Sequence, residues 1–288
     1  MRVAVTGATG TIGREVARVL RDRGDEVVAV SRNPASAGMD AVGWDDLDLS
    51  GFDGVIHLAG APLAQRWTDE GKRQIRDSRV EGTRRVVEAL RTADPRPRAL
   101  VSQSAEGYYP RGNELVSEDS PPGSGFLSEV VQAWEAEARK AEELGVRVVL
   151  PRTGVVLSKH GGALPKMLTP FKLGVGGPVA GGTQPFPWVD VRDVANALVY
   201  LLDTETARGP VNVVAPEKHT NKTFTKVLGK VIGRPTVFPV PSVAIKILYG
   251  EMGSTVTEGS NPDPSKLEQL GYTFNQPHLE DALRSQLG

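Results

Sequence analysis

The fold of this chain is decided at its start, in the stretch Arg2-Val3-Ala4-Val5-Thr6-Gly7-Ala8-Thr9-Gly10-Thr11-Ile12-Gly13. Its first residues are apolar and predict a buried strand, and the residues after Gly13 have the spacing of a helix that ends at Gly24. A second strand is predicted over residues 26–31. Strand, spaced glycines, helix and strand together are typical of a dinucleotide site, where backbone amides and a helix N-terminus face a pyrophosphate.

The loop after the first strand is therefore expected to contact a cofactor through Gly7, Thr9, Gly10, Thr11, Ile12 and Gly13. The first glycine permits a tight turn, the second lets the backbone approach the pyrophosphate, and the third lets helix and strand pack closely. The alternative interpretation is a glycine-rich connection in an α/β protein that binds no nucleotide.

The end of the second predicted strand indicates which cofactor is bound. NAD sites usually have an acidic residue there, which holds the ribose 2′-hydroxyl, whereas this chain has Ser31-Arg32-Asn33. An arginine pairs well with a 2′-phosphate, so the sequence favours NADP(H), with Ser31 and Arg32 as contacts. The alternative is that Arg32 is a solvated loop residue.

Composition excludes several classes of protein. The 288 residues include 34 Lys and Arg and 35 Asp and Glu, which argues against a nucleic-acid binder with its clustered basic surplus. No apolar segment is long enough to span a membrane, and no signal-peptide pattern is seen, so we expect a cytoplasmic protein. The absence of cysteine excludes disulfides and a cysteine nucleophile, and the four histidines lack the spacing of metal ligands, so no metal site is predicted.

The rest of the chain alternates strands and helices, which predicts an α/β fold with a Rossmann-like, doubly wound parallel sheet and a smaller C-terminal lobe. We expect the cofactor domain over residues 1–160, rejoined by 184–210, with a glycine-rich lid at 161–183 and the lobe at 211–288. An apolar strand is predicted over residues 54–60 and ends in Ala59-Gly60 at the carboxyl edge of the sheet, where Leu58, Ala59 and Gly60 are predicted cofactor contacts. His57 is expected to be structural.

Several motifs in order along the chain resemble the extended short-chain dehydrogenase/reductase superfamily. They are Thr6–Gly13, His57–Gly60, Gly82-Thr83, Ser104-Ala105 with Tyr108-Tyr109, Arg152-Thr153-Gly154, and Trp188-Val189-Asp190. Within it, Arg66-Trp67-Thr68, Trp134-Glu135 and Gly250-Glu251 resemble a subgroup of epimerase-family proteins. These are similar to nucleoside-diphosphate-sugar epimerases and carry a small C-terminal domain of unknown function.

This resemblance implies a protein that holds NADP(H) across the sheet edge, with a small-molecule substrate in a cleft beneath the lobe. It implies that Ser104 binds the substrate oxygen, and it places Arg152 among the cofactor contacts. Extended members are often dimers, so the expected state is a monomer or a homodimer.

The usual proton relay of the superfamily is missing. A tyrosine is normally followed four residues later by a lysine that lowers its pKa, but none of the five tyrosines here has such a lysine. Alignment places the two positions at Phe126 and Val130, and the supporting asparagine at Arg79. We therefore take Ser104 and Tyr108 as the catalytic candidates, with Tyr109 and Glu106 as further substitutes and Arg79 as a charge partner; the alternative for both tyrosines is a pocket wall.

The predicted substrate-pocket residues are Arg66, Trp67, Arg79, Glu106, Tyr109, Gln184 and Trp188. Arg66 and Trp67 would hold an anionic or planar group, unless Trp67 belongs to the core. Three functions stay open: an NADP(H)-dependent oxidoreductase with an atypical acid or base, a nucleotide-sugar epimerase or dehydratase, and a non-catalytic NADP(H)-binding sensor that acts on a partner.

Overall fold

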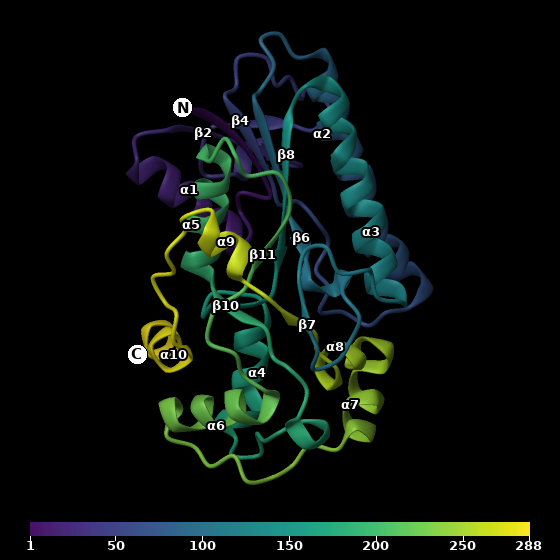
Figure 1. The fold of residues 1–288 in the computed structure, drawn as a ribbon, viewed down its shortest axis with the longest axis vertical. Coiled ribbons are helices and arrows are strands. Elements are labelled where there is room, and N and C mark those ends of the chain that lie inside the picture. Colours follow the sequence, from purple (N-terminus) through teal and green to yellow (C-terminus); the bar gives the residue numbers. More distant parts are fainter.

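A parallel sheet runs through the centre of the computed structural model, which describes residues 1–288 (Figure 1). Seven strands follow the order β11-β8-β5-β4-β1-β2-β3, and β6 pairs with the end of β8. Their bounds are β1 (Arg2–Thr6), β2 (Glu26–Ser31), β3 (Ala41–Gly43), β4 (Gly54–His57), β5 (Ala99–Ser102), β6 (Ser104–Ala105), β8 (Arg147–Thr153) and β11 (Gly209–Val213). The strand order reverses between β1 and β4, and ligands of such sheets bind at that point, outside the carboxyl ends of the strands.

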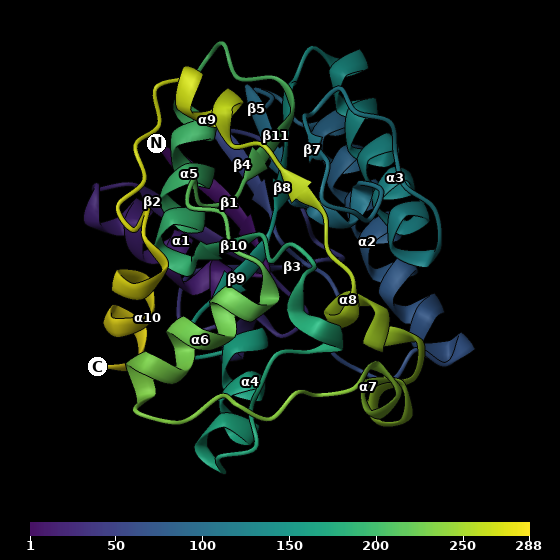
Figure 2. The same ribbon diagram turned by 60° about the horizontal axis from the view of Figure 1, so that its bottom comes forward.

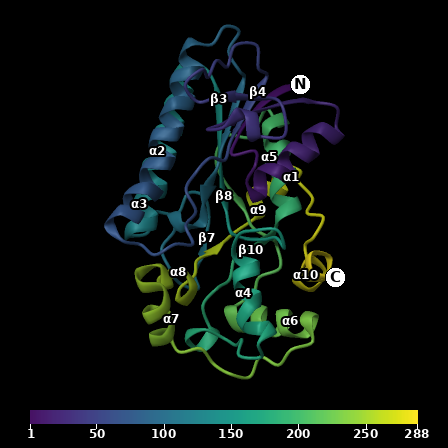
Figure 3. The same ribbon diagram turned by 180° about the vertical axis from the view of Figure 1, so that it is seen from behind.

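Helices cover both faces of the sheet, as the view from behind shows (Figure 3). One face is covered by α1 (Thr11–Asp22) and α5 (Val191–Asp203), the other by α2 (Asp69–Thr92) and α3 (Phe126–Arg139). The strands are apolar on both sides, so each face buries its own cluster, of 27 and 17 residues. The Thr68 hydroxyl accepts a hydrogen bond from the Gly71 amide and so fixes the start of α2. The parallel sheet with helices on both faces confirms the predicted fold class.

A smaller lobe lies beyond the carboxyl ends of the strands (Figure 2). It contains α4 (Ala163–Lys172), α6 (Asn221–Ile232), α7 (Ser242–Tyr249), α8 (Ser254–Thr257) and α10 (Leu279–Leu287). Leu164, Trp188, Phe224 and Leu283 contribute to its core. The lobe also has two short sheets, one of β9 (Val155–Leu157) with β10 (Trp188–Asp190), the other of β7 (Leu115–Val116) with β12 (Asn261–Pro262).

The C-terminal part of the chain does not stay in the lobe. The expected boundary at residue 211 falls inside β11, an outer strand of the main sheet. After α9 (Ser265–Gln269), Tyr272 and Phe274 pack into the larger core cluster. The Tyr272 hydroxyl donates to the Asp193 carboxylate at 2.9 Å. The last segment is thus tied to the N-terminal turn of α5.

Candidate cofactor and substrate site

The loop between β1 and α1 has the geometry of an anion cradle. Gly7 has a φ of 68°, a backbone conformation that favours glycine. The chain turns back after it, so that the Gly10 amide donates to the Gly7 carbonyl at 2.9 Å. A Cβ atom on Gly13 would lie 2.2 Å from that carbonyl oxygen. No side chain caps the helix at Gly10, so the first amides of α1 are left for a ligand.

The neighbouring end of β4 is fixed by a chain of buried hydrogen bonds. The Thr6 hydroxyl accepts from the amides of Leu58 (3.0 Å) and Ala59 (3.1 Å) and lies 2.7 Å from Nδ1 of His57. Nε2 of His57 lies 3.0 Å from the Thr83 hydroxyl. Burial, and then the charge of Arg79, lower the pKa of His57 to about 4. His57 is therefore structural, as expected, and it aligns Leu58 and Ala59 at the sheet edge.

Arg79 extends from α2 beneath Gly60. A Cβ on Gly60 would lie 3.2 Å from Cζ of Arg79, a tight contact that glycine avoids. Nη1 donates to the carbonyls of Ala61 (3.1 Å) and Ile75 (3.0 Å), and the guanidinium lies over the ring of Trp134. No carboxylate pairs with this cation, and burial lowers its pKa to about 10. Arg79 thus holds the start of the 61–67 loop.

Ser31 and Arg32 lie at the end of β2. Arg32 is exposed and makes no hydrogen bond or ion pair with the protein, while the Ser31 hydroxyl accepts from the Asn33 amide at 3.1 Å. The guanidinium of Arg32 is therefore free to meet an anion beside the cradle.

Ser104 and Arg152 belong to a buried network that leaves neither of them free. The Ser104 hydroxyl, 1% exposed, donates to Oε1 of Glu135 at 2.6 Å, and Arg152 forms a two-pronged ion pair with the same carboxylate at 2.8 and 2.9 Å. Arg152 also donates to the Tyr109 hydroxyl at 3.0 Å. Because the protein itself occupies their polar atoms, this placement lends no support to the expected substrate contact of Ser104 or the expected cofactor contact of Arg152.

The two tyrosines after Ser104 differ in exposure. Tyr109 is buried and its hydroxyl donates to Oδ1 of Asn212 at 2.7 Å, and burial raises its pKa to about 12. That placement argues against both an acid role and a pocket role for Tyr109. Tyr108 is half-buried, its ring lies 3.5 Å from Cζ of Arg152, and its hydroxyl has no partner in the protein.

Glu106 is also occupied by neighbouring side chains. Its carboxylate pairs with Arg111 at 2.9 Å and accepts a hydrogen bond from Ser260. It thereby joins the loop after β6 to the segment before β12, and this placement lends no support to the expected pocket role of Glu106.

Phe126 and Val130, where we expected the superfamily's relay positions, lie in an apolar cluster. Val130 is buried with Trp67 and Ile75, and Phe126 packs edge-on against Trp67 with ring centroids 5.1 Å apart. Nε1 of Trp67 donates to the Leu63 carbonyl at 3.0 Å. Of the two interpretations of Trp67, the structure supports the core one, because burying this large ring completes the cluster.

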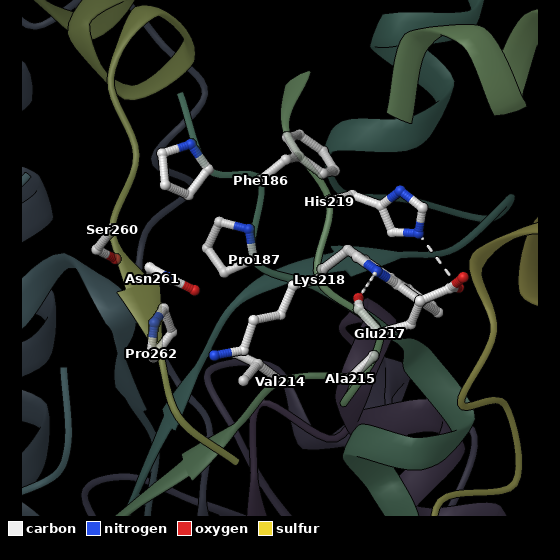
Figure 4. Close-up of a pocket in the computed structure, with 12 residues that line it drawn as sticks. Phe186, Pro187, Val214, Ala215, Glu217, Lys218, His219, Ser260, Asn261 and Pro262 are labelled. Carbon is white, nitrogen blue, oxygen red and sulfur yellow. Dashed lines mark hydrogen bonds and ion pairs between the residues drawn. The ribbon is translucent and has the colours of Figure 1, made fainter. Parts of the chain in front are cut away.

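Trp188 and Gln184 lie on the lobe side of the molecule. Trp188 is 1% exposed and its Nε1 donates to the Glu217 carbonyl at 2.9 Å. It lines a cavity of only about 20 Å³, room for one water, beside the Glu217–His219 pair (Figure 4). Gln184 ties the carbonyls of Val179 and Val256 together at 3.1 and 3.0 Å. Neither placement supports the substrate pocket expected for these residues.

A larger cavity, of about 250 Å³, lies between the 61–67 loop, α4 and α7. Among the predicted pocket residues it contains only Arg66. Sequence reasoning missed its other members, because Lys166, Leu248, Tyr249 and Met252 come from distant segments without a recognisable motif. No group of three His, Asp or Glu side chains is placed to hold a metal ion, and no helix is long and apolar enough to cross a membrane.

Comparison with protein families gives two matches. Residues 3–215 match the NAD dependent epimerase/dehydratase family, and residues 240–286 match a domain of unknown function, DUF1731. The sequence is 38% identical over 294 residues to the epimerase family protein SDR39U1 of Bos taurus, with 99% of both chains covered. It is 37% identical to the chloroplastic SDR39U1 homolog of Arabidopsis thaliana, covering 99% of this chain and 86% of that one.

Solved structures give the same picture. The human epimerase family protein SDR39U1 (isoform 2), crystallised with NADPH, has a TM-score of 0.92 and 34% identity, with 99% of both chains covered. A nucleoside-diphosphate sugar epimerase from Corynebacterium glutamicum has a TM-score of 0.80 and 32% identity, and this chain spans 58% of its length.

Proposed function

The chain belongs to the NAD dependent epimerase/dehydratase family, and from this premise we propose that it is an NADP(H)-dependent oxidoreductase that lacks the usual Tyr-x-x-x-Lys relay. The single observation that carries the proposal is the free cradle at the switch point of the sheet. The carboxyl edge of the sheet there holds the uncapped start of α1, the glycine turn and the unpaired Arg32.

The residues present fit NADP(H). Amides of Thr11, Ile12 and Gly13 would hold the pyrophosphate, with Gly7, Thr9 and Gly10 shaping the turn. Arg32, with Ser31, would hold the 2′-phosphate, and Leu58, Ala59 and Gly60 would line the path at the sheet edge. The bound cofactor supplies a hydride for reduction of a carbonyl group.

The 161–183 segment supports a covering role over this cradle. A Cβ on Gly161 would lie 2.2 Å from Oγ1 of Thr11, so the segment passes directly against the start of α1. We propose that it closes over the bound pyrophosphate, with α4 packed into the lobe core behind it.

Tyr108 is the proton donor that this proposal favours. Ser104, Glu106 and Tyr109 have their polar atoms engaged by the protein. The Tyr108 hydroxyl is without a partner, and this residue follows β6 at the carboxyl edge of the sheet. A positioned phenol within reach of a carbonyl oxygen suffices for general acid catalysis.

The test is a fluorescence titration of NADPH and NADH against the wild type and Arg32→Ala. We expect tight NADPH binding, weakened roughly tenfold to a hundredfold in the variant because a charge-assisted pair is lost, with NADH binding unchanged. Equal weakening of both cofactors, or no binding of either, would contradict the proposal.

The apolar cluster around Val130 favours a second candidate, an NADP(H)-binding sensor that acts through a partner. Epimerisation and dehydration need a proton relay, which this cluster replaces, so a nucleotide-sugar epimerase or dehydratase is the third candidate. Tight NADPH binding without oxidation by any member of a broad panel of carbonyls would select the sensor.

A further inference from the structure

The cavity of about 250 Å³ is built by three separate parts of the chain. The loop after β4 contributes Ala64, Gln65 and Arg66, helix α4 contributes Lys166, and the region of α7 contributes Leu248, Tyr249 and Met252. The loop is held in place from below, since the Ser78 hydroxyl accepts from the Ala61 amide at 2.9 Å and Arg79 donates to the Ala61 carbonyl. The wall that carries Arg66 is therefore fixed to α2.

The lining of this cavity carries positive charge without a matching negative charge. Arg66 and Lys166 both lack a carboxylate partner, and Lys166 donates only to the Ala64 carbonyl at 2.9 Å. Nε2 of Gln65 is buried without any hydrogen-bond partner. No Asp or Glu lines the cavity, and the nearby carboxylate of Glu251 is taken by Lys72. Two cations without a carboxylate partner thus line a space that lacks an anion.

The opposite wall of the cavity is apolar. Leu248 is 67% exposed and Tyr249 is 41% exposed, so the apolar surface of α7 is not covered by the rest of the chain. Met252 lines the cavity and also packs against the cluster of Trp67 and Val130. Met252 therefore connects the cavity to the apolar cluster that contains Val130.

We propose that this cavity binds the carboxylate of a small organic acid with an apolar body, and that this acid belongs to the substrate class of the enzyme. Arg66 and Lys166 hold the carboxylate, and Leu248, Tyr249 and Met252 cover the apolar body. The inference rests on the proposed function. A cavity of this size lies just below the usual range of ligand pockets, about 300–1,000 Å³, and suits a compact acid better than a nucleoside-diphosphate sugar.

The experiment is calorimetric titration of phenylacetate into the NADPH-saturated protein, with phenylacetamide as the uncharged match. We expect the acid to bind at least about tenfold more tightly than the amide, because it gains charge-assisted hydrogen bonds. Arg66→Gln and Lys166→Gln each weaken phenylacetate binding about tenfold. Lys172→Gln, an exposed change on α4 outside the cavity, leaves it unaltered.

Three results would overturn the inference: equal binding of acid and amide, no binding of phenylacetate, or an unchanged affinity in both cavity variants. Tighter binding of UDP-glucose than of phenylacetate would overturn it in favour of a nucleotide sugar. Arg66 and Lys166 are exposed, so both variants are expected to fold. NADPH titration on the same samples separates the two proposals, since failure to bind NADPH with retained phenylacetate binding refutes the cofactor proposal and supports the acid site.

Discussion

The Ser104 hydroxyl donates a 2.6 Å hydrogen bond to the Glu135 carboxylate in the interior of the protein. Glu135 in turn pairs with Arg152, so Ser104, which we expected to bind substrate, is here part of a closed network. Such a network is stabilising only while every member keeps its partners, because an unpaired buried polar group is costly.

Ser104→Ala is therefore expected to act on stability. Loss of a hydrogen bond to a buried carboxylate lowers the free energy of unfolding by about 1.5–3 kcal/mol, measured by urea denaturation. NADPH affinity stays unchanged. Ser124→Ala, in an exposed loop, is the control and leaves stability within about 0.5 kcal/mol. Loss of turnover without loss of stability would instead indicate that Ser104 contacts the substrate.

The buried His57 predicts a pH dependence of stability. Its pKa is about 4 in the folded protein and about 6.5 in the unfolded chain, so the unfolded state binds more protons between these values. The contribution of His57 to the free energy of unfolding is then fully present above pH 6.5. It is lost as the pH is lowered toward 4, by at most about 3 kcal/mol.

Urea denaturation at pH 7, 6 and 5 measures this effect. His57→Gln should flatten the slope between pH 6.5 and 4, although it lowers stability at pH 7 by removing the bonds to Thr6 and Thr83. His160→Gln, at an exposed position, should keep the wild-type slope. An unchanged slope in His57→Gln would show that another group causes it.

Gly13→Ala tests the cradle. The added Cβ would meet the Gly7 carbonyl at 2.2 Å, so the loop must shift, and we expect a loss of about 1–3 kcal/mol in stability together with weaker NADPH binding. Gly82→Ala in α2 is the matched control, because its Cβ would meet only His57 at 3.8 Å and alanine favours a helix. Wild-type NADPH affinity in Gly13→Ala would disprove the close packing of this loop.

Val130→Lys tests whether the expected relay position tolerates the lysine of the usual Tyr-x-x-x-Lys relay. Val130 is 2% exposed between Trp67 and Ile75, so a lysine buries a charge without a partner and should destabilise the protein by roughly 3 kcal/mol or more. Glu129→Lys, next to it on the exposed side of α3, should cost little. A stable Val130→Lys protein would mean that the cluster opens readily toward the cofactor.

Tyr108→Phe tests the proposed proton donor. With a carbonyl compound that wild-type protein reduces, we expect NADPH oxidation to fall by about a hundredfold, the usual contribution of a positioned general acid. NADPH affinity and thermal stability should stay at the wild-type level, because the hydroxyl has no partner in the protein. Tyr109→Phe should instead lower stability, since its hydroxyl bonds Asn212 and Arg152. Undiminished turnover in Tyr108→Phe would exclude it as donor.

The sequence alone determined the fold and the cradle, because both depend on local patterns. Strand and helix periodicity along the chain predicted the parallel sheet, and the spacing of Gly7, Gly10 and Gly13 predicted the turn before α1. The structural role of His57 was also predictable, since a histidine within an apolar strand has few alternatives. These features require only neighbours within a few residues or in adjacent strands.

Only the tertiary structure decided which polar residues are free. Glu135 and Asn212 occupy the polar atoms of Ser104 and Tyr109 in the fold, although they lie 31 and 103 residues away in the sequence. Glu135 also pairs with Arg152. Likewise Arg66, Lys166 and Tyr249 line one cavity, and no sequence motif predicts it. The physical reason is that side-chain availability depends on long-range packing and on the pairing of buried polar groups, which leave no periodic trace in the sequence.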